Sequence, residues 1–174
     1  MGALPALPQG TVLAIGNFDG VHPGHAALVR RAADIARAQH LIPAVLTFEP
    51  HPREFFAPAG APFRITLLPE KARRLAALGA AHVFVPAFDA GFASLSAAEF
   101  MAFLRDRLRA RHIVVGGDFA FGKNRAGNID ALRGLFDVTV IEPVTCADGA
   151  AYSSTRIRDL LRQGDLSAAA ALLG

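Results

Sequence analysis

The sequence predicts an α/β fold in which a five-stranded parallel sheet carries helices on both faces. Short apolar runs bounded by turn residues alternate along the chain with segments of helical periodicity. That alternation is typical of β-α-β units, which make neighbouring strands parallel and cover both faces of the sheet. The two longest polar segments, residues 16–25 and 116–128, each follow an apolar run directly. Ligands bind at that edge of a parallel sheet, so these segments are the expected walls of a site.

The first third of the chain is predicted to form a strand, a helix and a second strand. Val12–Ile15 is a short buried strand. Gly24–Gln39 is a helix whose apolar face comprises Leu28, Ala32, Ile35 and Ala36. Ile42–Phe48 is the second strand. The proline-rich residues 49–64 are expected to be a long loop, and loops of that length in a compact domain are usually functional.

The rest of the chain continues the alternation. Pro69–Leu78 is predicted as a short helix, because proline lies at its start and Gly79 lies just past its end. The capping-box pattern Ser96-Ala-Ala-Glu99 predicts the start of another helix. The further expected elements are strands at His82–Pro86, Ile113–Gly116 and Val138–Ile141, helices at Ala97–Arg109, Asp130–Leu135, Ser154–Gln163 and Leu166–Leu173, and a hairpin turn at Asp148-Gly149.

Composition narrows the class of protein. With 174 residues, one domain over residues 1–174 is expected. The net charge of +3 comes from intermixed residues without a basic block, and Trp is absent, so we expect no nucleic-acid partner. No apolar run approaches the ~18 residues of a membrane helix, and we see no secretory signal. We therefore expect a cytoplasmic protein without a membrane partner. The single Cys146 excludes internal disulfides.

The segment Gly16-Asn-Phe-Asp-Gly-Val-His-Pro-Gly-His25 joins the first strand to the first helix. Its glycines permit tight turns and close approach of a ligand to the backbone. His22 and His25 lie where free amides and the positive end of the helix dipole favour an anion such as a phosphate. Two other interpretations stay open: a structural turn with two surface histidines, and a metal-binding pair, which lacks an obvious third ligand.

A second polar motif, Ser153-Ser-Thr-Arg-Ile-Arg158, opens a later helix. Ser154 or Thr155 is the expected N-cap. Hydroxyls, free amides and guanidinium groups then converge within one turn, and arginine suits bidentate contact with phosphate. The alternative is an ordinary capped helix with solvated arginines.

Two further segments are weaker signals by themselves. In Gly116-Gly-Asp-Phe-Ala-Phe-Gly122, Asp118 follows a strand, where a carboxylate can accept hydrogen bonds from ribose hydroxyls; the alternative is a glycine-rich turn. Phe48-Glu-Pro-His-Pro52 continues to Phe55 and Phe56, and aromatic rings beside a basic residue suit a flat conjugated ligand that carries phosphate. The alternative is a hydrophobic plug under a loop.

The remaining candidates are assigned ordinary structural roles. Cys146 has no cation or base beside it in the sequence and is expected to be inert. Lys71, Arg73 and Arg74 are expected to form a solvated helix face. Neither G-x-x-x-x-G-K-[ST] nor G-x-S-x-G occurs, which excludes a P-loop kinase site and the nucleophile elbow of a serine hydrolase.

Four motifs in this order resemble those of one family. GNFDGVHPGH resembles the H-x-G-H signature of nucleotidyltransferases. With FEPHP, GGDFAFG and SSTRIR, the chain resembles over residues 11–162 the FMN adenylyltransferase (FAD synthetase) module of bacterial bifunctional riboflavin kinase/FAD synthetases. The resemblance implies a Rossmann-like nucleotidyltransferase fold and a reaction of ATP with FMN that gives FAD and pyrophosphate, with Mg²⁺. Because the FMN phosphate is itself a competent nucleophile, we expect direct in-line attack without a covalent enzyme intermediate.

The resemblance also implies roles for individual residues. Catalysis is assigned to His22, His25 and Arg158, with the two histidines contacting the ATP phosphates. Flavin binding is assigned to His51 and Phe56, and no metal ligand is assigned. Nucleotide binding is assigned to Gly16, Asn17, Phe18, Asp19, Gly24, Gly117, Asp118, Ser154 and Thr155.

The chain departs from the family pattern at a few places. Ala120 stands where the family often has a basic residue, and Asn128 where it often has an acidic one, so modest changes in ligand contacts are expected. The bifunctional enzymes continue into a riboflavin kinase domain that is expected to begin near Gly174, so no kinase activity is expected. Rival hypotheses are a nucleotidyltransferase with another acceptor, a non-catalytic flavin or nucleotide sensor, and an aminoacyl-tRNA synthetase fragment, against which the missing KMSKS-like segment argues.

Overall fold

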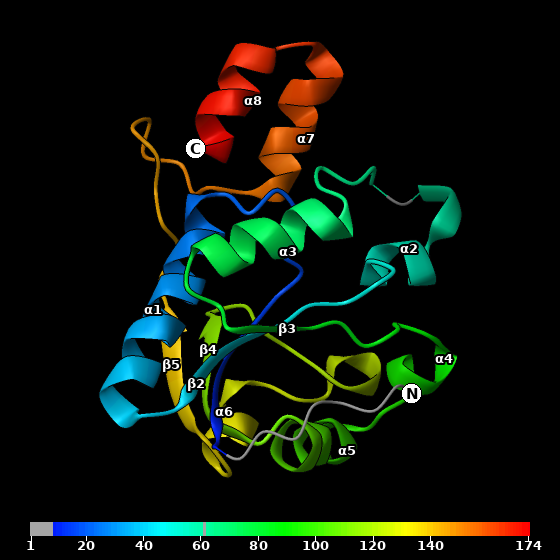
Figure 1. The fold of residues 1–174 in the computed structure, drawn as a ribbon. Helices are drawn as coiled ribbons and strands as arrows, with labels where there is room; N and C mark the ends of the chain where they lie inside the picture. Colours follow the sequence, from blue (N-terminus) through cyan, green and yellow to red (C-terminus); the bar gives the residue numbers. More distant parts are fainter. Residues whose placement is uncertain (1–8, 61) are drawn as a thin grey trace.

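The computed structural model describes residues 9–60 and 62–174, which form a parallel sheet with helices on both faces (Figure 1). The five strands lie in the order β3-β2-β1-β4-β5, and every neighbouring pair is parallel. Their bounds are Thr11–Ile15 (β1), Ile42–Leu46 (β2), His82–Phe84 (β3), Ala110–Gly116 (β4) and Asp137–Ile141 (β5). The predicted fold class is confirmed.

The direction in which strands are added to the sheet reverses beside β1. The chain moves outward from β1 to β2 and β3, and then crosses back to place β4 on the other side of β1. The loops that follow Ile15 and Gly116 therefore leave from neighbouring strands at the same edge. Parallel α/β sheets bind ligands in the crevice at such a reversal.

Helices connect the strands, and most lie where the sequence predicts them. Their bounds are Pro23–Gln39 (α1), Leu68–Ala77 (α3), Ala97–Ala102 (α5), Ile129–Arg133 (α6), Ser154–Gln163 (α7) and Leu166–Leu173 (α8). The helix expected to reach Arg109 changes after α5 into a π-helical turn, Phe103–Arg107 (η2).

Four short helical elements were not predicted. The expected loop over 49–64 is wrong in part, because it contains α2 (Pro52–Phe56) and a 3-10 turn, Pro58–Gly60 (η1). His51 caps α2 through its side chain, a role that the cap preferences of Ser, Thr, Asp and Asn do not suggest. The other unpredicted elements are α4 (Ala90–Ala93) and a 3-10 turn, Lys123–Arg125 (η3).

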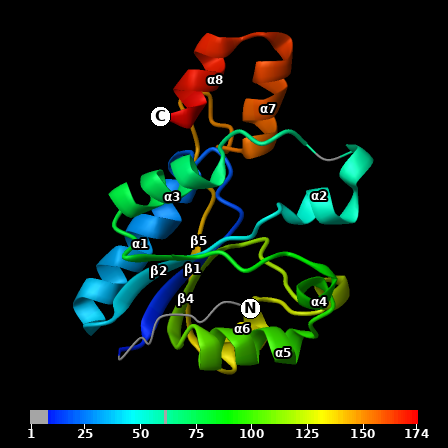
Figure 2. The same ribbon diagram turned by 45° about the vertical axis from the view of Figure 1, so that its right-hand side comes forward.

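Alternate side chains of β1 enter two separate cores. Val12 and Ala14 pack with the apolar faces of α1 and α3, whereas Leu13 and Ile15 pack with α5, η2 and α6 on the opposite face. Figure 2 shows these two helical layers on either side of the sheet. A central strand buried on both faces explains why its sequence is a continuous apolar run.

The α7–α8 pair packs beyond the carboxyl edge of the sheet rather than on either face (Figures 1 and 2). Its buried apolar side chains are Ile157, Ala169 and Leu172. No helix among the described residues has both the length and the apolar character needed to cross a bilayer.

Leu13→Ala should lower the free energy of unfolding by about 2 to 5 kcal/mol, because it opens a cavity in the centre of the sheet. The measurement is urea denaturation. Leu135→Ala makes the same change at a side chain that is 43% exposed and is the matched control. The control should change the free energy of unfolding by no more than about 0.5 kcal/mol. Equal losses in the two variants would contradict this placement of the core.

Candidate functional site

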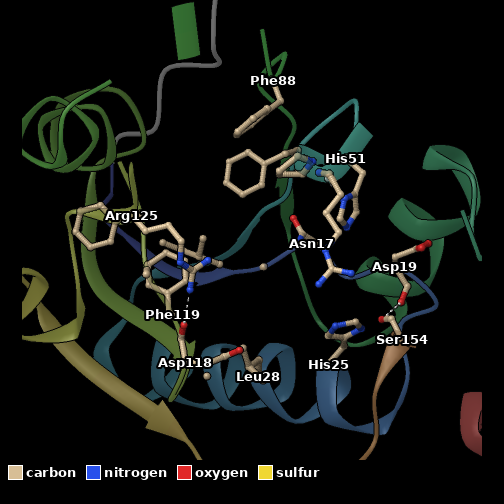
Figure 3. A pocket seen from close by; sticks show the side chains of 18 of the residues that line it. Asn17, Asp19, His25, Leu28, His51, Phe88, Asp118, Phe119, Arg125 and Ser154 are labelled. Atoms are coloured by element: carbon tan, nitrogen blue, oxygen red, sulfur yellow. Dashed lines mark hydrogen bonds between the residues drawn. The ribbon is translucent and has the colours of Figure 1, made fainter. Parts of the chain in front are cut away.

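A cavity of about 1300 Å³ opens where β1 and β4 end (Figure 3). Its walls come from the loop after β1 with the start of α1, and from residues 48–56, 88–95, 116–125 and 141–158. Every site residue predicted from the sequence lies on these walls except Phe18. Pockets for a single small ligand usually measure about 300–1,000 Å³, so this cavity is larger than most.

His22 and His25 lie against each other at the start of α1. His22 is the N-cap residue, and its Nδ1 accepts a hydrogen bond from the His25 amide at 3.3 Å. The two rings are stacked with centroids 3.7 Å apart. Gly24 allows this contact, since a Cβ there would lie 3.1 Å from the His22 ring. Because Nδ1 accepts, the neutral His22 ring carries its proton on Nε2, where it can be donated to a ligand.

Both histidines are neutral at pH 7 in the free protein. Burial lowers the pKa of His22 to about 4, with the negative charge of Asp19 acting in the opposite direction. Burial, the neighbouring His22 and the charges of Lys71 and Arg158 together lower the pKa of His25 to about 3, with the negative charge of Asp19 acting in the opposite direction. The Nδ1 atom of His25 is buried and has no hydrogen-bond partner among the described residues. The pair therefore presents neutral donors until an anion approaches.

Asp19 and Arg158 form a buried ion pair at one side of the cavity. Arg158 Nη2 lies 2.5 Å from Asp19 Oδ2, and both side chains are 5% exposed. Asp19 also accepts hydrogen bonds from the amides of Ile65 and Thr66, and Arg158 Nε donates to the Phe63 carbonyl at 2.9 Å. Burial alone would raise the pKa of Asp19, but the two amides and Arg158 outweigh it and lower the pKa. Asp19 is therefore ionised at neutral pH.

The start of α7 is capped differently from the prediction. Ser153, rather than Ser154 or Thr155, is the N-cap, and its side chain accepts hydrogen bonds from the Thr155 and Arg156 amides. Ser154 Oγ donates to the Asp19 carbonyl at 2.8 Å, a bond drawn in Figure 3. Thr155 is exposed on the cavity wall. The cap thus leaves the first turn of α7 facing the space beside the histidines.

An aromatic cluster forms the opposite end of the cavity. Phe88 contacts the rings of both Phe55 and Phe56 edge to face, with centroids 5.6 and 5.7 Å apart. Phe56 is 67% exposed, so its ring is available to a ligand. His51 lies beside this cluster (Figure 3), and its Nδ1 accepts a hydrogen bond from the Arg53 amide. Burial, and after it the charge of Arg158, lowers the pKa of His51.

The loop after β4 forms a further wall. Gly117 and Asp118 are exposed at its start, and Arg125 Nη2 lies 3.4 Å from the Asp118 carbonyl oxygen (Figure 3). Ala120, which stands where the family often has a basic residue, also lies on the cavity wall. Asn128 caps α6 through its side chain, which accepts from the Ala131 amide. That second departure therefore has a structural use.

Three residues lie elsewhere than the sequence suggests. The solvated position expected for Lys71 is wrong, because its side chain is 4% exposed and its Nζ donates to the Asn17 carbonyl at 3.2 Å. Phe18 is fully buried in the core under α1, so only its backbone is near the cavity. Cys146 has a cation beside it after all, since Arg156 Nη1 lies 3.0 Å from its sulfur.

Two residues of the site lie outside the motifs from which the sequence analysis predicted it. Tyr152 lies beside the His22 ring, with centroids 6.4 Å apart, and Thr66 donates from its hydroxyl to Asp19. Tyr152 directly precedes the α7 cap, and that adjacency was the one sequence clue to its place.

The donor set does not build a metal cage by itself. Among residues 9–60 and 62–174, no three His, Cys, Asp or Glu side chains gather closely enough to hold an ion. Asp19, whose negative charge acts on both histidines, is already paired with Arg158.

Fold and cavity together define an α/β nucleotidyltransferase, with the histidine pair at the reversal of the sheet and the first turn of α7 beside it. Comparison with known proteins agrees. Residues 4–156 match the FAD synthetase family, and the chain belongs to that family.

Relatives show the same relationship over nearly the whole chain. A relative from Geobacillus thermodenitrificans (strain NG80-2) is 41% identical over 167 residues, covering 95% of this chain and 90% of the relative. The bifunctional riboflavin kinase/FMN adenylyltransferase of Escherichia coli (strain K12) is 42% identical over 172 residues, covering 95% of this chain and 55% of the relative. This chain thus spans about half the length of the Escherichia coli protein.

A solved structure confirms the fold. A crystal structure described as a macrolide-efflux protein from Streptococcus pneumoniae superposes with a TM-score of 0.87 at 34% identity. The match covers 97% of this chain and 58% of that chain.

Asp19→Asn should lower the free energy of unfolding by about 3 to 5 kcal/mol, because it leaves the buried Arg158 without its counter-charge. Urea denaturation at pH 7 measures it. The control is Asp106→Asn, which removes the carboxylate of an exposed pair with Arg105 and should leave the free energy of unfolding nearly unchanged. An Asp19→Asn variant as stable as the control would show that the Asp19–Arg158 pair does not contribute to the stability of the fold.

The free energy of unfolding should fall as the pH drops from about 6.5 toward 4, because unfolded histidines take up protons there while His22 and His25 stay neutral in the fold. His22→Asn should make that slope shallower and leave the cap intact. Leu135→Ala, which changes an exposed side chain and removes no titratable group, should keep the slope. Parallel slopes for all three proteins would contradict the burial of this pair.

Proposed function

We propose that this chain transfers the adenylyl group of ATP to FMN, giving FAD and pyrophosphate. The observation that carries the proposal is the joining, in one cavity, of the stacked His22–His25 pair with the start of α7 and an aromatic wall. The FAD synthetase family and the name of the Escherichia coli relative support this substrate choice.

In the proposed reaction, an oxygen of the FMN phosphate attacks the α-phosphorus of ATP in line. The new phosphorus–oxygen bond forms as the bond to the β-phosphate oxygen breaks, and pyrophosphate leaves with that electron pair. No protein nucleophile is needed, so the protein's part is to align two anionic groups and stabilise the charge between them. Mg²⁺ would arrive with the ATP phosphates and screen them. Among the described residues, no three His, Cys, Asp or Glu side chains gather to hold the ion without those phosphates.

Each wall has a distinct part in this proposal. His22 donates from Nε2 to a phosphate oxygen, and His25, next to it, becomes protonated as the anion approaches. Ser154, Thr155 and Arg158 lie where the triphosphate and then the pyrophosphate are held. Gly117 and Asp118 face the nucleoside. The aromatic rings at His51 and Phe56 pack against the flavin.

The test is chromatographic analysis of products after the purified chain is mixed with MgATP and FMN, with riboflavin in a parallel reaction. We expect FAD from FMN and no FMN from riboflavin. His22→Asn, which keeps the helix cap, should lower kcat by about 10²-fold or more and affect KM far less.

Three results would contradict the proposal. Binding of FMN and ATP without any product would favour a non-catalytic binding module. Adenylylation of another acceptor in preference to FMN would favour a different nucleotidyltransferase. An unchanged kcat in His22→Asn would remove that residue from the chemistry.

A further inference from the structure

Lys71 is a buried cation just behind the wall of the cavity. Its Nζ donates to the Asn17 carbonyl at 3.2 Å and to Thr47 Oγ1 at 3.5 Å. Asn17 lines the cavity and Lys71 does not, so a single residue lies between the ammonium group and the space where a ligand would bind. The charge comes from α3, an element with no other part in the site.

Within the described part of the chain, no carboxylate forms an ion pair with Lys71. Asp19 is paired with Arg158, and Glu49 and Glu54 share Arg64. Burial lowers the pKa of Lys71, while the more distant charges of Glu49 and Asp19 act the other way. A buried cation without a directly paired anion lowers the stability of a fold. Stability therefore does not explain why Lys71 lies here.

Anchoring of the backbone does not require the charge. The Asn17 carbonyl also accepts a hydrogen bond from Thr47 Oγ1 at 3.0 Å, so it would stay bonded without Lys71. The charge does reach the site. After burial and His22, Lys71 is among the groups that lower the pKa of His25, and it acts on His51 in the same direction.

We propose that Lys71 is a positioning residue for polyanionic nucleotides, which supplies through Asn17 a fixed positive charge that the phosphates of a bound nucleotide balance. The inference rests on the proposed function, since it concerns the same nucleotide site. Lys71 touches neither substrate; it acts by holding the Asn17 carbonyl and by its field. The ligand class is therefore a nucleoside triphosphate or pyrophosphate, and an uncharged nucleoside gains nothing from it.

The test is calorimetric titration of the full chain with MgATP, with Mg²⁺-pyrophosphate and with adenosine, and no activity is required. Lys71→Met should weaken ATP and pyrophosphate binding by about tenfold or more, which is about 1.4 kcal/mol, and leave adenosine binding unchanged. Its Tm should stay the same or rise, because a buried charge without a paired carboxylate has been removed. A merely structural role would lower Tm and weaken adenosine equally.

Further variants separate charge from hydrogen bonding and from helix packing. Lys71→Gln keeps a neutral donor, should show the same loss, and decides the question where the methionine variant fails to fold. Thr47→Val removes the neutral hydrogen bond to the same carbonyl and should weaken ATP binding less than either Lys71 variant. Arg73→Met, on the exposed face of α3 where Arg73 pairs with Glu70, should bind ATP as the unmodified chain does.

Three outcomes would overturn the inference: ATP affinity within about twofold of the unmodified chain in both Lys71 variants, equal losses for ATP and adenosine, or a Thr47→Val loss as large as that of Lys71→Met. Failure of the proposed function is separate from these. An unmodified chain that binds ATP but forms no FAD would remove adenylyl transfer to FMN, and the binding data would still decide the part played by Lys71.

Discussion

The buried pair of Asp19 and Arg158 is the contact on which the geometry of the cavity depends. Asp19 belongs to the loop after β1, and Arg158 belongs to α7. The Asp19 carboxylate also accepts hydrogen bonds from the amides of Ile65 and Thr66. The α7–α8 pair lies outside both cores of the sheet (Figure 1). The ion pair and the bond from Ser154 to the Asp19 carbonyl therefore fix α7 relative to the histidines. Since an unpaired buried charge is strongly unfavourable, the stability of the fold and the shape of the site depend on each other.

The loop after β1 also holds backbone that is uncommon for its residue types. Phe18 and Val21 have φ values of 51° and 46°, and such values are unfavourable above all for a β-branched residue. The Phe18 ring is anchored in the core, and the next residue, Asp19, is held by its ion pair and amides. Burial on one side and charge on the other thus maintain a strained turn. Strain of this kind persists where the surroundings over-determine it, as they do at binding sites. Here the turn delivers His22 to the start of α1.

Local patterns were sufficient to predict the sheet and most of the cavity wall, because strand periodicity and motif spacing do not depend on distant partners. Partnerships between distant segments could not be predicted in that way. Arg158 pairs with a residue 139 positions away, and the motif indicated only that it could bind an anion. Lys71 was misassigned because charge was weighed before spacing. It precedes the buried Leu75 by four residues on α3, and that interval was the available signal that both lie on the inner face.

The site combines two kinds of basic residue: cations of constant charge, and histidines that are neutral until a ligand binds. In the proposed site, Arg158 and Lys71 supply the fixed positive charge, whereas burial leaves His22 and His25 neutral. Four cations so close together would repel one another, and neutral imidazoles avoid much of that repulsion. A bound phosphate reverses the balance, because a nearby negative charge raises the pKa of an imidazole. In the proposed adenylyl transfer, the fixed cations would attract the nucleotide first, and the histidines would gain charge only once the phosphates lie beside them. The site would then carry its greatest positive charge when the substrates bring their negative charge into it. Positive groups aimed at the charge that develops during the reaction stabilise the transition state.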